Sequence, residues 1–215
     1  AVVTGGLVQL PQAVTYPIPP PPSPAPPTGN QIVTGSNGCN DSGFAAASCS
    51  GSPGNLVLDP LGGTVMGADV KLTGGTVLHL KAGTYNFNSI SLQGNSAIVV
   101  DSGPVILQIT GTGQTTPIDL SGGSTTNASF IPKKLQILYG GNAAVKVAGG
   151  AAASMMVFAP NADVTLTGGG DLYGAVLGRT IDDGGGTSIH YDRDLPTEFY
   201  VAWNTMMSGF SWKKY

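Results

Sequence analysis

Charged side chains are scarce in this sequence. Lys, Arg, Asp and Glu make up 10% of its 215 residues, against about 25% in an ordinary globular domain, and Glu198 is the only glutamate. Because helical bundles and coiled coils need Ala, Glu, Lys and Leu in quantity, this shortage argues against a mostly helical protein. The 33 glycines follow no three-residue period, so collagen is excluded as well.

Basic clusters and long apolar runs are also missing. The formal net charge is -3 and the nine Lys and Arg residues are scattered, so we expect no nucleic-acid partner. Apolar runs such as 151–160 are shorter than the roughly 20 residues of a membrane-spanning helix, and we expect no membrane span in this chain. The sequence begins at Ala1 without the charged and apolar regions of a signal peptide. We therefore expect any export signal or anchor to have been removed or to lie outside it.

The sequence does contain a patterned set of apolar residues. Hydrophobic residues make up 41% of the chain, and β-branched residues recur in runs that can bury a core, which argues against disorder throughout. With helices disfavoured and glycine abundant, these runs predict an all-β domain rich in tight turns.

Two cysteines, Cys39 and Cys49, enclose a short loop of mainly Gly, Ser and Ala residues that has no obvious means of ordering itself. We predict a disulfide between them, which on the chain-entropy model restricts the unfolded loop by roughly 2–3 kcal/mol and suits an exported protein. Two reduced thiols are the alternative. Because no histidine stands near them, a zinc site is disfavoured, and the sequence predicts no metal and no cofactor.

Prolines are concentrated near the N-terminus. Eight of the eleven residues in 17–27 are proline, which fixes the backbone in polyproline II without internal hydrogen bonds. We predict that this segment is a stiff spacer or a strap that lies on a surface. Residues 1–55 are thus expected to form an N-terminal arm with the proline-rich segment and the disulfide loop.

An internal repeat follows the arm. Five segments share an apolar-x-apolar pattern that ends in Gly-Gly or Gly-Asn, and their starts are 20, 28, 27 and 19 residues apart: 70–75, 90–95, 118–123, 145–150 and 164–169. Strict alternation predicts that each is a short strand with one face buried. The glycines are expected to supply the positive φ that a sharp corner demands.

One corner motif at this spacing is typical of a β-solenoid, in which each turn of chain stacks on the last in parallel register. An antiparallel sandwich is the competing architecture, with turns expected about every 8–12 residues. Because the same motif recurs at one-coil spacing, we predict a single parallel β-solenoid (β-helix) over residues 56–195.

The last segment, 196–215, departs from the repeat. A possible helix there carries apolar side chains on one face, and a further tryptophan follows: Phe199, Trp203, Met206, Met207, Phe210 and then Trp212. Because a solenoid exposes an apolar end that must be covered, we predict an aromatic C-terminal cap. Docking onto a neighbouring subunit is the main alternative, and a signal-like or lipid-binding role is a minor one.

The densest polar group lies just before that segment and consists of Asp182, Asp183, His190, Asp192 and Arg193. Paired carboxylates there could act as general acid and base in a carbohydrate-active enzyme. However, Asp-Asp-Gly-Gly-Gly is also typical of a tight turn in which Asp side chains bind the backbone, and His190 could make structural hydrogen bonds on a strand. We favour the structural interpretation and predict no catalytic residues.

Four local motifs carry a resemblance to a known family: 80–85 (LKAGTY), 157–162 (VFAPNA), 172–176 (LYGAV) and 189–192 (IHYD). The run 69–196, about 60% of the chain, resembles the β-helical C-terminal domain of bacterial pilus-assembly proteins of the PilX/TadG kind. Proteins of that kind normally carry an N-terminal hydrophobic helix, where this sequence has a proline-rich start. The resemblance implies an exported, non-catalytic, cell-surface module, with adhesion or pilus association as its role.

We therefore predict a non-catalytic structural or adhesive protein, extracellular or at the bacterial cell surface. It would be a pilus-associated or filament-forming subunit that assembles through its ends or its arm. Its expected partners are other protein subunits, either copies of itself or pilus components, or a surface or glycan ligand. The alternative is a carbohydrate-active β-helix enzyme, a polysaccharide hydrolase or lyase that uses the Asp182, Asp183 and His190 region.

Overall fold

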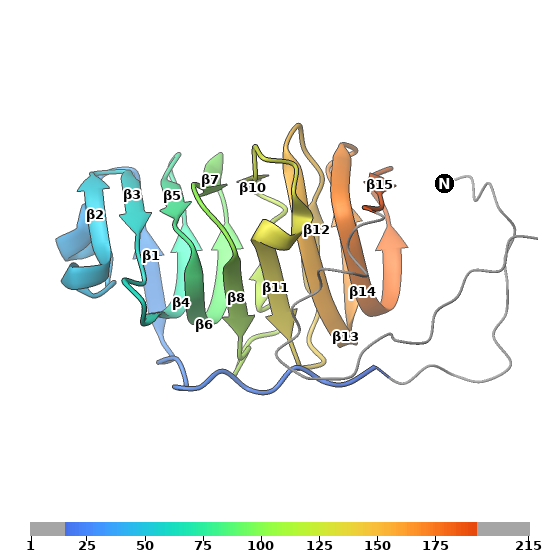
Figure 1. Cartoon of the computed structure of the whole chain (residues 1–215), viewed down its shortest axis with the longest axis horizontal. Coiled ribbons are helices and arrows are strands. Elements are labelled where there is room, and N and C mark those ends of the chain that lie inside the picture. The colour runs from blue at the N-terminus through green and yellow to red at the C-terminus, as the bar shows by residue number, and fades with distance from the viewer. Residues whose placement is uncertain (1–15, 193–215) are drawn as a thin grey trace, which may run out of the picture.

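The computed structural model describes residues 16–192. The regular structure of this part is almost entirely β-strand, with three short 3-10 helices, so the all-β prediction is confirmed. The strands stack side by side along one long axis (Figure 1), and nearly all neighbouring strands are parallel. The chain is therefore a parallel β-solenoid, as the repeat predicted.

The longest strands bend, so that one strand takes part in two ladders. The first half of β6 (Gly83–Leu92) pairs with β8 (Val105–Ile109), and its second half pairs with β9 (Ile118–Asp119). The pairing of β4 with β6 and that of β13 with β14 are interrupted at the same corner. The ten-stranded sheet thus contains two ladders joined at a corner. A third ladder consists of strands from the five-stranded sheet together with β15 and the first residues of β13 and β14.

We name the three ladders face 1, face 2 and face 3. Face 1 comprises the first halves of β4 (Thr64–Leu72) and β6, then β8, β11 (Leu135–Tyr139) and the middle parts of β13 (Ala153–Thr167) and β14 (Asp171–Asp183). Face 2 comprises β1 (Asn30–Val33), the second halves of β4 and β6, then β9, β12 (Val145–Ala148) and the ends of β13 and β14. Face 3 comprises β3 (Asn55–Leu58), β5 (Val77–Leu80), β7 (Ser96–Val100), β10 (Gly123–Thr126), β15 (Ser188–His190) and the first residues of β13 and β14.

The five predicted repeats occupy one position in successive coils of face 2. Their first residues pair in a continuous register and are at most 1% exposed: Val70, Ile90, Ile118, Val145 and Val164. The two longer spacings contain the extra residues of the loops at 110–117 and 127–134. Alternate residues along these strands point into a shared core, which is the interior of the solenoid.

The glycine corners are of two kinds. Gly74 and Gly75 have φ of +63° and +76°, as expected for a turn that only glycine adopts readily. Gly122 and Gly123 do not have positive φ, and there the expectation was wrong. A Cβ at Gly122 would lie 2.3 Å from the carbonyl oxygen of Leu92, and a Cβ at Gly123 would lie 2.2 Å from that of Ser96. At this corner glycine is required because the previous coil passes too close for a side chain.

The N-terminal end of the stack is closed. β2 (Cys49–Ser52) pairs with β3 in antiparallel fashion, and the short helices η1 (Cys39–Asp41) and η2 (Ala46–Ser48) lie in the loop before it. The predicted disulfide Cys39–Cys49 is present, with Cα atoms 5.6 Å apart. Phe44, from the same loop, is buried and packs 5.9 Å from the ring of Phe87. This loop therefore covers the first coil.

The proline-rich segment is a strap. In Figure 1 it runs along one side of the stack, under several coils, before the chain enters β1. The carbonyl oxygen of Pro24 accepts a hydrogen bond of 2.8 Å from Asn86 Nδ2, and that of Pro19 lies against Gly140. Asn86 points outward between the buried Tyr85 and Phe87 of face 1. Of the two predicted roles, spacer and strap, the structure has the strap, and it lies on face 1.

The last described coil is less buried than the first. Among the strands of residues 16–192, β15 pairs only with β14. Ile181 and Ile189 are 47% and 44% exposed, although they align with the buried Val164 and Leu172 of the preceding coil. The parallel ladder itself begins at β1, which precedes residue 56. No helix within residues 16–192 is long and apolar enough to cross a membrane.

Candidate interaction surfaces

The described members of the predicted polar group do not lie at one place. Asp182 and Asp183 are consecutive on the face 2 part of β14, where Asp182 aligns with the outward Thr165 and Asp183 with the buried Leu166. Successive side chains of a strand point to opposite sides, so these two carboxylates diverge. Asp183 Oδ1 accepts a 2.8 Å hydrogen bond from the backbone N–H of Thr187. This is the turn role that the sequence also allowed.

His190 lies on a different face from the two aspartates. It belongs to β15 on face 3, where it aligns with Tyr173 of the previous coil. The two rings stack with centroids 4.7 Å apart, and His190 Nε2 lies 3.0 Å from Asp171 Oδ1. Asp192 is half-buried just beyond β15. His190 thus takes part in contacts between coils, as its structural interpretation predicted.

The other predicted site residues cannot be placed. Arg193 and the expected cap or docking residues Phe199, Trp203, Met206, Phe210 and Trp212 lie outside the described residues.

Sequence reasoning missed an exposed aromatic residue, Phe130, that packs on Tyr173. Phe130 is 48% exposed and packs edge-to-face on Tyr173 at 5.1 Å. Its φ is +51°, which is unusual for a bulky residue. The loop around it is fixed by the buried Asn127, whose Nδ2 donates to the carbonyl oxygens of Ile131 and Ser154. No local sequence signal identifies this contact, because Asn127 binds Ser154 in the next coil.

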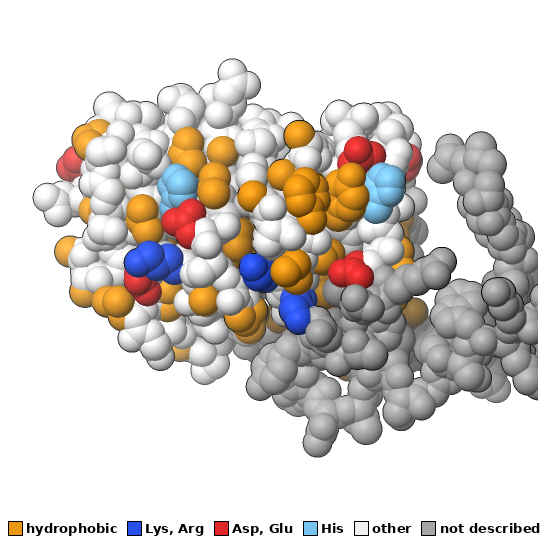
Figure 2. Space-filling view, turned by 45° about the horizontal axis from the view of Figure 1, so that its top comes forward, with side chains coloured by type: hydrophobic (Ala, Val, Ile, Leu, Met, Phe, Trp, Pro, Cys, Tyr) orange, Lys and Arg blue, Asp and Glu red, His pale blue; other side chains and the backbone are white. Residues whose placement is uncertain are grey.

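Both histidines of the chain lie on the outer side of face 3, each beside an aspartate of a neighbouring coil, as Figure 2 shows. His79 Nδ1 is 2.7 Å from Asp101 Oδ1, and the second pair is His190 with Asp171. All four side chains are partly or largely exposed. Within the part of the chain that the structure describes, no three His, Cys, Asp or Glu residues are grouped so as to hold a metal ion.

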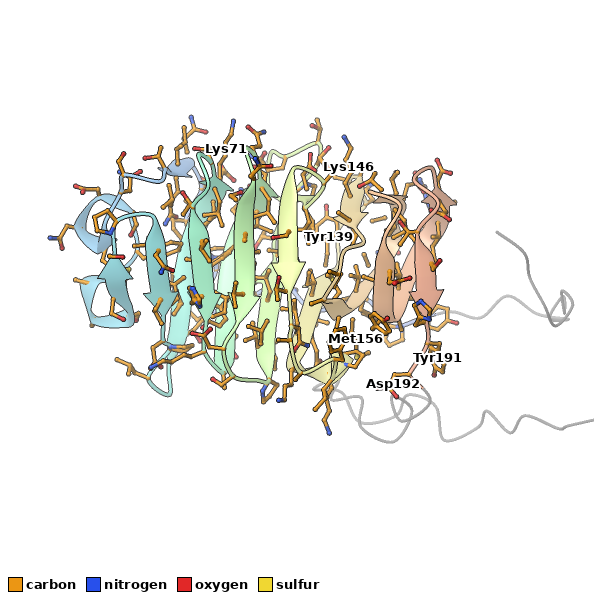
Figure 3. The ribbon with its side chains drawn as sticks, turned by 90° about the horizontal axis from the view of Figure 1, so that it is seen from above. Lys71, Tyr139, Lys146, Met156, Tyr191 and Asp192 are labelled. Carbon is orange, nitrogen blue, oxygen red and sulfur yellow. A yellow bond between two sulfur atoms is a disulfide. The ribbon has the colours of Figure 1, made fainter. Side chains whose placement is uncertain are left out.

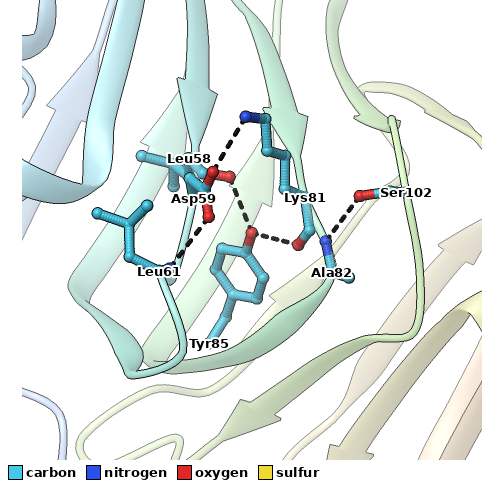
Figure 4. Close-up of polar contacts among 7 residues, drawn as sticks. All are labelled: Leu58, Asp59, Leu61, Lys81, Ala82, Tyr85 and Ser102. Atoms are coloured by element: carbon cyan, nitrogen blue, oxygen red, sulfur yellow. Dashed lines mark hydrogen bonds and ion pairs between the residues drawn. The ribbon is translucent and has the colours of Figure 1, made fainter.

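The corner between faces 3 and 1 is held by a buried tyrosine (Figure 4). The hydroxyl of Tyr85 lies 2.6 Å from the carbonyl oxygen of Lys81 and 3.0 Å from that of Leu58. Burial raises the pKa of Tyr85 above its ordinary value, so the group stays a hydrogen-bond donor. Outside the corner, Lys81 Nζ pairs with Asp59 at 3.0 Å. The LKAGTY motif therefore has a structural role.

The outer sides of faces 1 and 2 differ. On face 1, the outward residues of successive coils align in two columns, and none of these residues is fully exposed. Four of them are at most 5% exposed: Asn86, Gln136, Met156 and Phe158. The strap contacts this face at Asn86 and near Gly140, and η3 (Pro132–Lys134) packs against β11, β13 and β14. Face 1 is thus covered.

Face 2 carries small and charged residues on its outer side. One column of outward residues runs through seven coils in unbroken register: Ile32, Lys71, Ser91, Asp119, Lys146, Thr165 and Asp182. Figure 3 shows Lys71 and Lys146 pointing away from the same side of the solenoid, opposite Met156 and Tyr191. Each of these seven side chains is exposed or half-exposed. Among the described residues, no carboxylate lies within ion-pair distance of Lys71 or Lys146.

A shallow depression of about 370 Å³ lies at the glycine corner beside face 2. Its lining is small and polar: Asn95, Ser96, Ser121, Gly122, Gly123 and Ser124. It contains no titratable side chain, so it offers hydrogen bonds but no acid or base.

One family model matches the chain, described as a domain of unknown function (DUF7305), over residues 35–198. The match spans about three quarters of the 215 residues. No curated protein and no solved structure matches the chain.

Proposed function

We propose that this chain, which belongs to the DUF7305 family, is a non-catalytic structural or adhesive module of the bacterial cell surface, associated with pili of the kind assembled with PilX/TadG-like proteins. Its work would be to hold binding surfaces in fixed positions along a rigid stack. The partners in this proposal are other protein subunits or a surface glycan.

One observation carries the proposal. The stack is closed at its first coil by the Cys39–Cys49 disulfide, and disulfides persist in oxidising compartments outside the cytosol. The disulfide supports an exported location, and a bacterial surface structure is the setting that the pilus-protein resemblance adds.

The contacts of the polar residues support a structural rather than a catalytic role. A glycosidase places two carboxyl groups about 5–10 Å apart around one bond, whereas Asp182 and Asp183 point to opposite sides of a strand. His190 is engaged by Asp171 and Tyr173 on another face. No observation on residues 16–192 favours the carbohydrate-active alternative.

Localisation in the native host tests the proposal. Cells are sheared to release surface appendages, and the protein is followed with an antibody in the sheared fraction, the cell envelope and the cytoplasm. We expect it in the sheared fraction, with Cys39 and Cys49 resistant to alkylation unless a reductant is added. Recovery in the cytoplasm with two reactive thiols would contradict the proposal.

A further inference from the structure

The outer column of face 2 has a charge order that is complementary to its own reverse. Counted from the N-terminal coil, lysine occupies the second and fifth positions and aspartate the fourth and seventh, while the first, third and sixth are uncharged. When a second copy runs in the opposite direction, the second position faces the seventh and the fourth faces the fifth. Lys71 then meets Asp182, and Asp119 meets Lys146.

We infer that face 2 is a self-association surface, and that two copies of this chain pack there side by side and antiparallel about a two-fold axis. The axis lies in the interface, parallel to the strands, between the coils of Asp119 and Lys146. A two-fold interface uses the same patch on both copies, so each charge pair occurs twice. The inference goes beyond the proposed function and does not depend on where the protein is located.

The remaining contacts of this arrangement are compatible with close packing. At the uncharged positions Ser91 faces Thr165. One column further along the strands, Gln93 faces Thr167 and Ser121 faces Ala148. These side chains are small or flexible, and no like charges meet. A flat parallel ladder of such residues allows two sheets to approach to about 10 Å.

Neither lysine is held in an ion pair within the described part of its own copy, although Asp119 is the neighbour of Lys146 on the adjacent coil. Among residues 16–192, neither Lys71 nor Lys146 has an ion-pair partner, whereas Lys81 is engaged by Asp59 and Arg179 by Asp163. Face 1 is not an equivalent surface, because the strap lies on it. The N-terminal end is closed by the disulfide loop, which disfavours stacking of one copy's first coil on another's last.

The size of the face predicts weak association. Six facing coils spaced by about 4.8 Å, with about four to five residues per strand, give roughly 400 Å² for each partner. This is below the roughly 800 Å² per partner of a standard stable interface. Dimers are therefore expected at tens to hundreds of micromolar and should weaken as salt screens the charges.

Charge reversal in the full chain tests the inference by sedimentation equilibrium. Lys71→Glu places like charges against Asp182, and Asp182→Lys places them against Lys71. Each variant alone should lose at least about tenfold in association constant. An equal mixture of the two variants should recover it, because the heterodimer pairs Glu with Lys at one end and the native Asp with Lys at the other. Lys134→Glu, outside face 2 but with the same change in charge, should dimerise as the wild type does.

Cross-linking tests the register. The two cysteines of the sequence are joined in the disulfide. Ser91→Cys and Thr165→Cys therefore each introduce one free thiol. A short bis-maleimide should join Ser91→Cys to Thr165→Cys in a mixture, and should join neither variant efficiently to itself, since like positions lie three coils apart. A wild type that is monomeric at several hundred micromolar in low salt overturns the inference. So does a dimer unaffected by both charge reversals, or cross-linking that is no better between the two variants than within each.

Discussion

Faces 1 and 2 share the long strands β4, β6, β13 and β14 but use their outer sides differently. In β6, Tyr85, Phe87 and Ile90 all point into the core. On the outer side of the same strand, Asn86 is fully buried under the strap, whereas Ser91 is half-exposed. The inner column therefore makes the solenoid, and the outer column decides whether a face is covered by the chain itself or is free to meet a partner.

This difference is visible in the residue patterns. Face 2 strands alternate strictly, as in Val145–Ala148 with its burial order of buried, exposed, buried and half-buried. By contrast, β13 is buried at every position from Ala153 to Ala159, a run that includes its face 1 part. A strand that loses its alternation is buried on both sides, so the run Met155-Met156-Val157-Phe158 signals a covered face.

The largest expected effect comes from the core that the two faces share. Phe87 is fully buried and its ring contacts those of Phe44 and Tyr85. Phe87→Ala should lower the free energy of unfolding by about 3–5 kcal/mol, measured by urea denaturation. Ile32→Ala, at an outer position of face 2 that is 52% exposed, is the control and should change it by less than about 0.5 kcal/mol. Similar losses in both variants would contradict the distinction between inner and outer columns.

The closed first coil comes next. Replacing both Cys39 and Cys49 by Ser removes the cross-link of a ten-residue separation and should cost about 2–3 kcal/mol. Hydrogen exchange should speed up in β2 and β3 but not in β12. A uniform loss of protection along all coils would show that the disulfide does not act locally.

The strap gives a smaller effect that separates the two faces within one strand. Asn86→Ala removes the hydrogen bond to Pro24 and should cost about 1–2 kcal/mol, with faster proteolysis within 16–29. Ser91→Ala, five residues along the same strand on the uncovered face 2, is the control. Its free energy of unfolding should stay within about 0.5 kcal/mol of the wild type, and its rate of proteolysis within about twofold. If the two variants behave alike, the strap does not stabilise face 1.

The smallest effect concerns the corner between faces 1 and 2. The hydrogen bond from Arg179 is the main cause that lowers the pKa of Asp163, and Thr180 adds to it. A lowered pKa in the folded state means that the stabilisation is present above the ordinary value near 3.8 and is lost as the pH falls through the folded-state value. In Asp163→Asn, the free energy of unfolding should therefore fall less steeply than in the wild type as the pH drops below about 4. An unchanged acid limb would mean that the exposed pair is fully screened.

The sequence predicted the solenoid and the disulfide because both depend on local features. A corner motif at one-coil spacing fixes which residues stack, and Val70, Ile90 and Val164 indeed share one column. The assignment of the strap to face 1 could not be predicted, because the bond between Pro24 and Asn86 joins residues 62 positions apart. The pairing of His190 with Asp171 and Tyr173 likewise depends on the register between coils. The sequence does not determine this register, because the coils differ in length.

The path of the strap has a mechanical consequence. The chain lies near Gly140 at Pro19 and then runs back over the coils to Asn30, where β1 begins. A pulling force applied through residue 16 would break the contacts of the strap one after another. Only then would it act on the hydrogen bonds between β1 and β4. The released 14 residues, 16–29, extend by about 3 Å each in polyproline II, or roughly 40 Å. Under tension the strap would thus detach and extend first, while the stacked coils stay folded.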